Sequence, residues 1–239
     1  MSPRVFACGP HATPPALVPG GRLVLDRDES HYLRRVRRVR VGATVEVIDG
    51  AGALWSATLA DDDARACALE LGERLPTITP PRVVDLVLCM PESAATLTAL
   101  TGASEAGAHS ITLARSARSS TSPPSAARQL RVLRAAQRQC GRPLPPEVHG
   151  PMSLTDAVRA HAVNGQGFFA WAAPAVRAQS ERPNVVGPRV WLVVGPEGGL
   201  VEEEVNVLRE VGATAIGLGP WVLRSETAAI AGIALLLNV

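Results

Sequence analysis

Hydrophobic and polar residues alternate in short runs through the first 78 residues of the chain, and Gly, Asp and Pro separate the runs. Alternation of this kind predicts β-strands, because successive side chains of a strand point to opposite faces of a sheet. The runs are "RVFA" (4–7), "RLVLD" (22–26), "TVEVIDGAG" (44–52), "LWSATLA" (54–60) and "RACALEL" (65–71). Short strands at this spacing predict a small, mostly antiparallel β-barrel over residues 1–78.

The pattern changes after "LPTITPPR" (75–82), where three prolines predict a linker. Beyond the linker, continuous apolar runs alternate with segments of helical period. The apolar runs are "VVDLVLCM" (83–90), "SITLA" (110–114), "GFFAWA" (167–172), "RVWLVVG" (189–195) and "TAIGLG" (214–219). This alternation predicts βαβ units with a buried parallel sheet and helices on both of its faces. The sequence therefore predicts an α/β protein with a barrel at residues 1–78 and an α/β domain at 79–239.

Composition narrows the class of protein. At 46% hydrophobic and 19% charged residues, the chain has enough apolar material for a globular core. The longest apolar stretch, "AAIAGIALLLNV" (228–239), is too short to cross a bilayer, and the start "MSPRVFACGP" lacks an apolar signal core. We therefore expect a cytoplasmic protein that makes no membrane contact.

The cysteines give no sign of a metal site. Cys8, Cys67, Cys89 and Cys140 are scattered and include no CxxC pair, and no histidines cluster with them. A disulfide framework or a structural metal would need such spacing. We therefore expect buried thiols in a reducing compartment, and no bound metal.

Arginine supplies all 24 basic residues, although the net charge is only +2. One concentration is "HYLRRVRRVRVG" (31–42), which carries Arg34, Arg35, Arg37, Arg38 and Arg40. The other is 109–146, which has seven arginines, among them Arg142, and no Asp or Glu. A surface that is rich in arginine and free of carboxylates suits the phosphate backbone of nucleic acid. An ordinary solvated surface remains the alternative.

A helix is predicted within the second arginine-rich stretch. The segment "SPPSAARQLRVLRAAQRQCGR" opens with prolines and reaches Gly141, a typical helix end. At 100° per residue, Arg131, Arg134 and Arg138 fall within about 60° of each other, opposite a mainly apolar face. The helix is therefore predicted to be amphipathic, with an arginine stripe.

The segment "VVGPEGGLVEEEV" (193–205) predicts a strand, a glycine turn and a helix. Such turns usually cradle phosphate, because backbone amides at a helix start attract anions. Here Glu197 lies inside the turn and three further carboxylates, Glu202, Glu203 and Glu204, follow it. The turn therefore suits a neutral or cationic ligand that still needs amide donors, such as adenine and ribose beside a sulfonium. A purely structural turn remains an alternative.

A second glycine segment, "GLGPWVLRSETAAIAG" (217–232), follows the next predicted strand. It lacks the third glycine of the dinucleotide fingerprint, and the chain ends before an acidic ribose ligand could follow. A dinucleotide site is therefore rejected. What remains is a polar pair, Arg224 and Glu226, directly before an apolar helix. A simple helix cap with Ser225 at the N-cap is the structural alternative.

Together, "VVGPEGGLVEEEV" and "GLGPWVLRSETAAIAGIALL" resemble the paired C-terminal motifs of the RsmE-type 16S ribosomal RNA uridine-N3 methyltransferases of the SPOUT superfamily. "HYLRRVRRVRVGATVEVIDGAG" is similar to that family's PUA-like RNA-binding barrel, and "AAQRQCGRPLPPEV" to its central Gln–Arg–Pro segment. The resemblance covers nearly the whole chain. It implies a PUA-like barrel followed by a SPOUT α/β domain with a trefoil knot.

The resemblance also implies S-adenosylmethionine as cofactor, 16S ribosomal RNA of the small subunit as substrate, and a homodimer formed through the C-terminal domain. The cofactor would be bound by Gly195, Glu197, Gly198, Gly199, Leu218, Gly219, Val222 and Leu223. Arg224 would stabilise the uracil anion, and Glu226 would accept the N3 proton, directly or through water, or orient Arg224. The RNA would be bound by Arg34, Arg35, Arg37, Arg38, Arg40, Arg131, Arg134, Arg138 and Arg142.

Some positions depart from the family pattern. Trp221 stands where relatives carry a basic residue, "MPES" (90–93) lacks the usual lysine, and no acidic residue follows "GFFAWA". These departures favour a catalytically silent RNA-binding or ribosome-assembly factor as the alternative function. The intact "GPEGG" and "LRSETA" motifs favour the enzyme.

Overall fold

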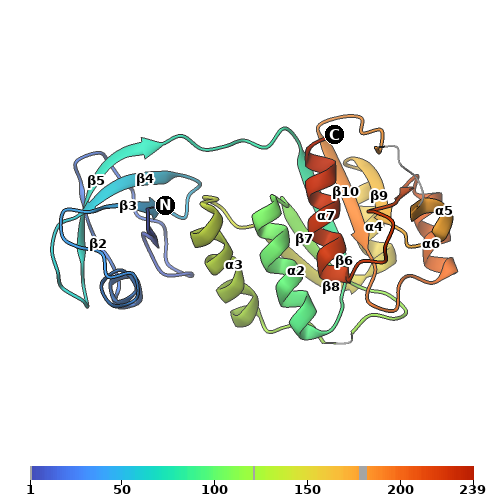
Figure 1. The fold of residues 1–239 in the computed structure, drawn as a ribbon, viewed down its shortest axis with the longest axis horizontal. Coiled ribbons are helices and arrows are strands. Elements are labelled where there is room, and N and C mark those ends of the chain that lie inside the picture. The colour runs from blue at the N-terminus through green and yellow to red at the C-terminus, as the bar shows by residue number, and fades with distance from the viewer. Residues whose placement is uncertain (1, 121, 178–181) are drawn as a thin grey trace. The chain divides into compact units, whose positions relative to one another are not determined.

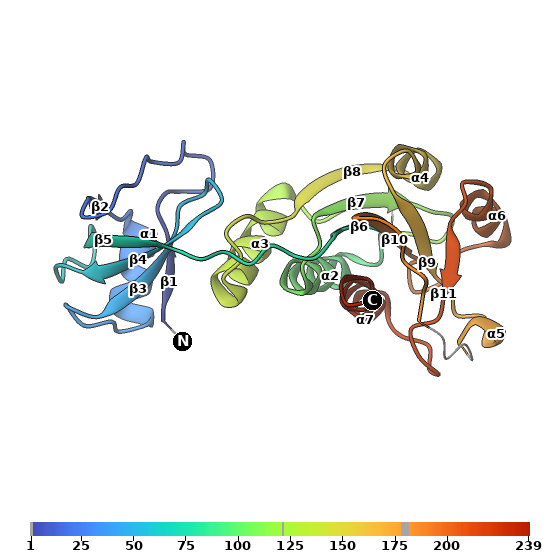
Figure 2. The ribbon, with the colours of Figure 1, turned by 90° about the horizontal axis from the view of Figure 1, so that it is seen from above.

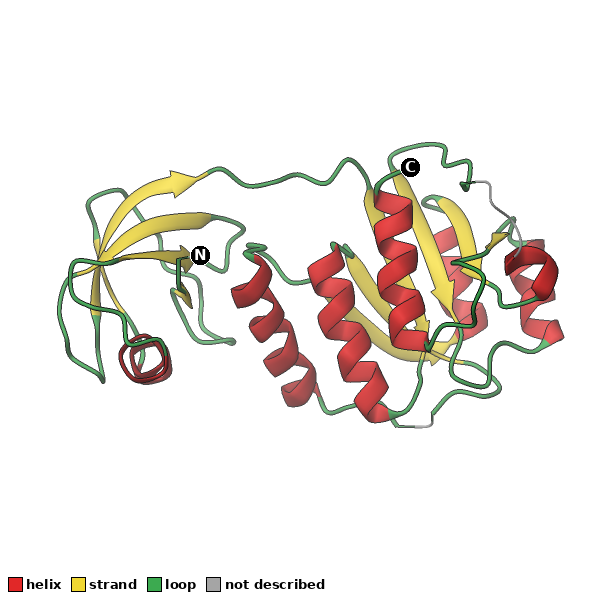
Figure 3. Ribbon diagram, in the orientation of Figure 1, coloured by secondary structure: helices red, strands yellow, loops and turns green. Residues whose placement is uncertain are grey.

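The computed structural model describes residues 2–120, 122–177 and 182–239. The chain forms two compact units (Figure 1, Figure 3). The first unit contains the chain up to Thr79 together with Gln137–Pro145, and the second contains Pro80–Ala136 and Pro146–Val239. The return of Gln137–Pro145 to the first unit does not appear in the division expected from the sequence.

The first unit is built on a five-stranded sheet with the order β1-β3-β4-β5-β2. Its strands are β1 (Arg4–Phe6), β2 (Arg22–Val24), β3 (Thr44–Ile48), β4 (Leu54–Leu59) and β5 (Ala68–Leu75). β1 pairs in parallel with β3, and the other neighbours are antiparallel. All five strands predicted from the alternating runs are present, and inward residues such as Val45, Val47 and Leu69 are fully buried in the core of this unit.

A helical segment in the first unit was not expected from the sequence. α1 (Arg27–His31) continues directly into a π-helical turn, η1 (Tyr32–Val36). The side chain of Asp26 caps α1 by accepting a hydrogen bond from the Glu29 amide at 2.9 Å. The "HYLRRV" part of the arginine stretch is therefore helical.

The second unit contains a six-stranded sheet with the order β11-β9-β10-β6-β7-β8, and every pair in it is parallel. Its strands are β6 (Val83–Cys89), β7 (Ser110–Arg115), β8 (Glu147–Ser153), β9 (Gln166–Ala170), β10 (Arg189–Val194) and β11 (Thr214–Ile216). The predicted apolar runs form five of them. β8 was not predicted, because it is a half-exposed edge strand that contains Gly150 and Pro151.

Helices cover both faces of this sheet, as the sequence predicted (Figure 2). The helices of the second unit are α2 (Ser93–Ala106), α3 (Ala126–Cys140), α4 (Leu154–Ala162), α5 (Pro174–Arg177), α6 (Glu202–Glu210) and α7 (Ser225–Leu237), and the last residues of α3 belong to the first unit. α2, α3 and α7 bury apolar residues against one face, and α4 and α6 against the other. The mixed α/β architecture is thus confirmed.

Two glycines allow α7 to pack closely within its own chain. A Cβ at Gly102 of α2 would lie 2.3 Å from Cδ1 of Ile230, and one at Gly232 would lie 2.5 Å from Cδ2 of Leu192. The apolar circumference of α7 is therefore used largely by α2 and the sheet. Throughout the described ranges, no helix is both long and apolar enough to cross a membrane.

The cysteines are less uniformly buried than expected. Cys67 and Cys89 are buried, but Cys8 is half-buried and Cys140 is exposed at the end of α3. Burial raises the pKa of the Cys89 thiol to about 12. Within the described residues, no group of three or more His, Cys, Asp or Glu side chains could hold a metal ion.

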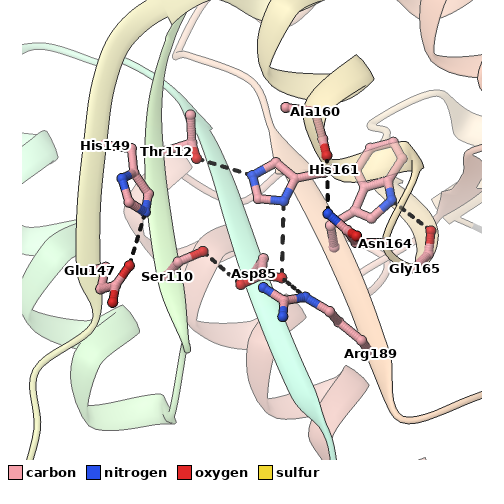
Figure 4. A network of polar contacts seen from close by, with 11 residues as sticks. Asp85, Ser110, Thr112, Glu147, His149, Ala160, His161, Asn164, Gly165 and Arg189 are labelled. Carbon is pink, nitrogen blue, oxygen red and sulfur yellow. Dashed lines mark hydrogen bonds and ion pairs between the residues drawn. The ribbon is translucent and has the colours of Figure 1, made fainter.

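A buried polar network joins the amino-terminal ends of three strands (Figure 4). The Asp85 carboxylate of β6, which is 1% exposed, accepts hydrogen bonds from Ser110 Oγ at 2.6 Å and from Arg189 Nε at 2.7 Å. His161 of α4 lies beside it and contacts Thr112 Oγ1 at 3.1 Å. Because its acceptors are satisfied and the glycine segments lie at the other end of the strands, we assign this network a structural role.

Candidate functional site

Three adjacent strands, β11, β9 and β10, end at a single cavity of about 450 Å³. Ligands of α/β proteins commonly bind at the carboxyl ends of parallel strands. Nine predicted site residues line this cavity: all eight that were assigned to the cofactor, and the predicted catalytic residue Arg224. They are Gly195, Glu197, Gly198, Gly199, Leu218, Gly219, Val222, Leu223 and Arg224. The structure thus brings together two segments that the sequence separates.

One side chain joins the first glycine turn (195–199) to the second glycine loop (217–224). Ser225, at the start of α7, is 4% exposed and donates a hydrogen bond from Oγ to the Gly195 carbonyl at 2.8 Å. The N-cap of α7 is Arg224, whose side chain makes no capping bond. The alternative in which Ser225 caps the helix is therefore wrong, because its hydroxyl bonds to the other turn.

The loop after β7 holds the first glycine turn from outside. Arg118 donates a hydrogen bond from Nη1 to the Gly198 carbonyl at 2.6 Å. A Cβ at Gly198 would lie 3.2 Å from Cβ of Arg118, so the glycine turn and the loop after β7 approach closely there. Sequence reasoning missed Arg118, because it lies 80 residues before the turn.

The carboxylates near the turn are mostly bound to the protein itself. Glu204 accepts hydrogen bonds from the amides of Val201 at 2.9 Å and Ala117 at 2.6 Å. Glu202 pairs with Arg209 at 3.2 Å. Among the four, only Glu197 lines the cavity, and it accepts a weak hydrogen bond from the Glu92 amide at 3.3 Å. The charge facing a ligand is therefore much smaller than the sequence suggested.

The second glycine loop is also fixed in place. Arg177 donates from Nη1 to the Pro220 carbonyl and from Nε to the Ala172 carbonyl, both at 2.8 Å. Gly219 has a φ of 129°, which favours glycine. Trp221 and Val222 at the loop tip remain 78% and 69% exposed.

The predicted catalytic pair is only partly assembled at the cavity. Arg224 lines it and is exposed, whereas Glu226 is half-buried in the first turn of α7 and does not line it. Within the described residues, no hydrogen bond or ion pair links Arg224 to Glu226. A direct contact in which Glu226 orients Arg224 is therefore not seen in this structure.

Comparison with known proteins agrees with this architecture. Residues 79–237 match a family described as an RNA methyltransferase domain, and residues 25–71 match an RNA methyltransferase PUA domain. A Mycobacterium tuberculosis protein named ribosomal RNA small subunit methyltransferase E is 31% identical over 221 residues, which cover 88% of this chain and 84% of the relative. The chain belongs to the ribosomal RNA small subunit methyltransferase E family.

Other similar proteins match over most of this chain and of their own. A relative of that name from Aquifex aeolicus is 28% identical, over 92% of this chain and 95% of its own. The solved structure of the Neisseria gonorrhoeae member, bound to S-adenosyl methionine, is 25% identical with a TM-score of 0.82 and covers 98% of this chain and 96% of that one. A Legionella pneumophila structure with bound SAM has the same TM-score at 23% identity and covers 99% and 97%.

The arginines expected at an RNA surface of this family member divide into two groups. The exposed group consists of Arg35, Arg37, Arg38 and Arg40 in the first unit and Arg131 on α3. Across the described part of the chain, no hydrogen bond or ion pair holds the side chains of the four arginines of the first unit. They are therefore available to a ligand.

The other group is engaged by the protein or partly buried. Arg138 donates from Nη2 to the buried Glu29 at 2.6 Å, and its guanidinium stacks over Tyr32 at 4.0 Å from the ring centre. Arg138 is thus not a free, exposed residue of the arginine stripe, because this contact anchors the end of α3 in the first unit, and its RNA-binding role stays a prediction. Arg34 bonds to the Val39 carbonyl. Arg134 and Arg142 are half-buried, and burial lowers the pKa of Arg142.

Proposed function

We propose that the protein transfers a methyl group from S-adenosylmethionine to N3 of a uridine in 16S ribosomal RNA of the small subunit. The observation that carries this proposal is the cavity made by the two glycine segments and joined by the Ser225–Gly195 hydrogen bond. It lies in a chain whose family is named for small-subunit ribosomal RNA methylation and has members solved with this cofactor. Arg224 and Glu226 are the proposed catalytic residues.

The cavity suits S-adenosylmethionine in size and lining. Its volume of about 450 Å³ lies within the range of small-molecule sites, roughly 300–1,000 Å³. Gly199 and Gly219 line it with positive φ angles, and a Cβ at either would meet no atom within 4 Å. Side chains there would project into open space that we assign to the cofactor. The glycine backbone would supply amides and carbonyls to hold the cofactor, and Glu197 would supply negative charge that suits a sulfonium.

When bound, S-adenosylmethionine supplies an activated methyl group on a sulfonium. Uracil N3 must lose its proton to attack this group. The exposed guanidinium of Arg224 borders the cavity and stabilises the negative charge that develops on the uracil oxygens. Glu226 does not line the cavity, so we assign it proton acceptance through an intervening water. The target base must also leave its stack to reach the cavity.

The first unit would position the RNA. Its four exposed arginines, Arg35, Arg37, Arg38 and Arg40, lie within six residues and suit the phosphate backbone. Arg131 of α3 adds a further exposed cation. We propose that residues 1–78 act as a PUA-like RNA-binding domain, and that 79–239 carry the methyl-transfer reaction.

Three further features rest on the resemblance to the SPOUT superfamily. We propose a trefoil knot that brings the two glycine segments together, which agrees with the link from Ser225 to Gly195. We propose a homodimer formed through the second unit, although α7 offers it only a narrow strip, with Thr227 and Ala234 exposed. We also propose that the protein acts in the cytoplasm, where ribosomal subunits are assembled.

A catalytically silent RNA-binding factor is the second candidate. The exposed Trp221 favours it, because the family resemblance leads us to expect a basic residue there. The two candidates are separated by nucleoside mass spectrometry of small-subunit RNA from cells with and without the gene. Loss of one N3-methyluridine in the deletion strain, restored by the parent gene and not by an Arg224→Ala variant, supports the enzyme. Unchanged methylation in the deletion strain would leave only the binding function.

A further inference from the structure

The second glycine loop presents an indole to solvent at the edge of the cavity. Trp221 lines the cavity and is 78% exposed, whereas Trp191 in the sheet is 1% exposed. The loop that carries Trp221 is fixed on both sides. Arg177 holds the Pro220 carbonyl, and Ser225 is bonded to Gly195. The backbone that carries the exposed ring is thus held on both sides of Trp221.

The chemistry around this ring suits an unstacked base. Arg224 also lines the cavity, three residues further along the chain, and its exposed guanidinium can meet the oxygens of uracil. An aromatic face beside such a donor provides the two contacts that proteins use for unstacked bases, stacking and polar contacts to the base edge. Stacking of a base on an aromatic side chain contributes about 1–3 kcal/mol by alanine substitution.

We propose that Trp221 stacks on the uracil that enters the cavity and so determines how tightly the RNA substrate is held for the reaction. This inference rests on the proposed function, since it assigns a residue to the base of that same reaction. A second copy of the chain that covers the ring is the other occupant, and the test below separates the two.

The experiment compares three variants in a methyl-transfer assay on small ribosomal subunits from the deletion strain. Trp221→Leu removes the aromatic face and Trp221→Phe keeps a ring. Val163→Ala is the matched control, because Val163 is an apolar residue that is 80% exposed and does not line the cavity. We expect Trp221→Leu to raise the KM for subunits about 5- to 150-fold, which is the fold-change for 1–3 kcal/mol. The KM for S-adenosylmethionine should stay unchanged, and Trp221→Phe should recover most of the loss.

Three results would overturn the proposal. These are an unchanged KM for subunits in Trp221→Leu, an equal loss in Val163→Ala, and dissociation of a dimer by Trp221→Leu in light scattering. The last result would assign the ring to a second copy. Circular dichroism checks that each variant is folded, and substitution at these exposed positions removes little buried surface.

A binding measurement separates this inference from the proposed activity. A short oligouridine should quench the tryptophan fluorescence of the parent, whereas an abasic oligonucleotide of the same length should not, and Trp221→Phe should abolish the quenching. Quenching by both oligonucleotides, or quenching that persists in Trp221→Phe, would refute stacking. If the parent shows uridine-dependent quenching and methylates nothing, the stacking stands and the proposed activity fails. If the parent methylates subunits and Trp221→Leu does so equally well, the proposed activity stands and the stacking inference fails.

Discussion

Removal of the Ser225 hydroxyl should weaken cofactor binding, because this group joins the two walls of the cavity. Ser225→Ala deletes the 2.8 Å hydrogen bond to the Gly195 carbonyl. Leaving a buried acceptor unsatisfied costs about 1–3 kcal/mol. Gly195 lines the cavity, however, so water can reach its carbonyl once the hydroxyl is gone. We therefore expect the binding free energy of S-adenosylmethionine to weaken by about 1 kcal/mol, which raises the Kd about fivefold.

Isothermal titration calorimetry with S-adenosylmethionine measures this effect directly. Ser225→Thr keeps a hydroxyl and should bind more tightly than Ser225→Ala. Thr227→Ala removes an exposed hydroxyl from the same helical turn and is the matched control. Thermal unfolding of each variant shows whether the change is confined to the site. The reasoning fails if Ser225→Ala binds the cofactor as the parent does, or if Thr227→Ala loses as much affinity.

Three more outcomes are expected from other parts of the chain. The double variant Arg35→Ala, Arg38→Ala should weaken RNA binding and reduce the slope of log K against log salt concentration by about 1.4, which is ~0.7 for each of two single-strand phosphate contacts. The control double variant Arg65→Ala, Arg74→Ala should leave both unchanged. Filter binding at several salt concentrations measures the affinity and the slope. Burial lowers the pKa of His161 in the folded protein; Asp85 opposes this effect, and Arg189 and His149 add to it. The His161 imidazole therefore binds a proton more readily in the unfolded chain than in the folded protein. The free energy of unfolding should therefore decrease as the pH falls below about 6.5. In chemical unfolding at several pH values, this decrease should be smaller in His161→Gln and unchanged in the control His149→Gln. Maleimide should label the exposed Cys140 in the native protein and leave Cys89 unlabelled until unfolding, as peptide mass spectrometry would reveal.

The strands could be predicted because their periodicity follows directly from burial. β10 is buried on both faces of a parallel sheet and therefore appears as the apolar run "RVWLVVG", and β3 has one buried face and alternates. β8 gave no such signal, since it lies at the edge of the sheet and alternates weakly around Gly150 and Pro151. α1 was missed although Asp26 and Glu29 have the spacing of a cap, because the segment is only five residues long.

The site shows where reasoning from sequence ends. Local motifs marked both glycine segments, and their residues do line one cavity. Contacts between distant segments could not be predicted, since Ser225 lies 30 residues from Gly195 and Arg118 lies 80 residues from Gly198. The same limit misplaced Arg138. Helical spacing put it on an exposed stripe, but its partner Glu29 lies 109 residues away.

The carboxylates after the first glycine turn bear on cofactor choice through the loop that they hold. Glu204 binds the Ala117 amide, which places the neighbouring Arg118 against the Gly198 carbonyl. Glu204 thus stabilises the first glycine turn indirectly, through the loop after β7, whereas Glu197 lies in the turn itself and borders the cavity. At this turn a phosphate would meet the negative charge of Glu197 with Arg118 engaged by the backbone, whereas a sulfonium would meet a favourable charge. The first glycine turn thus favours a cationic group by the position of one carboxylate rather than by the charge of the whole segment, while Arg224 brings positive charge to the cavity from the second glycine loop.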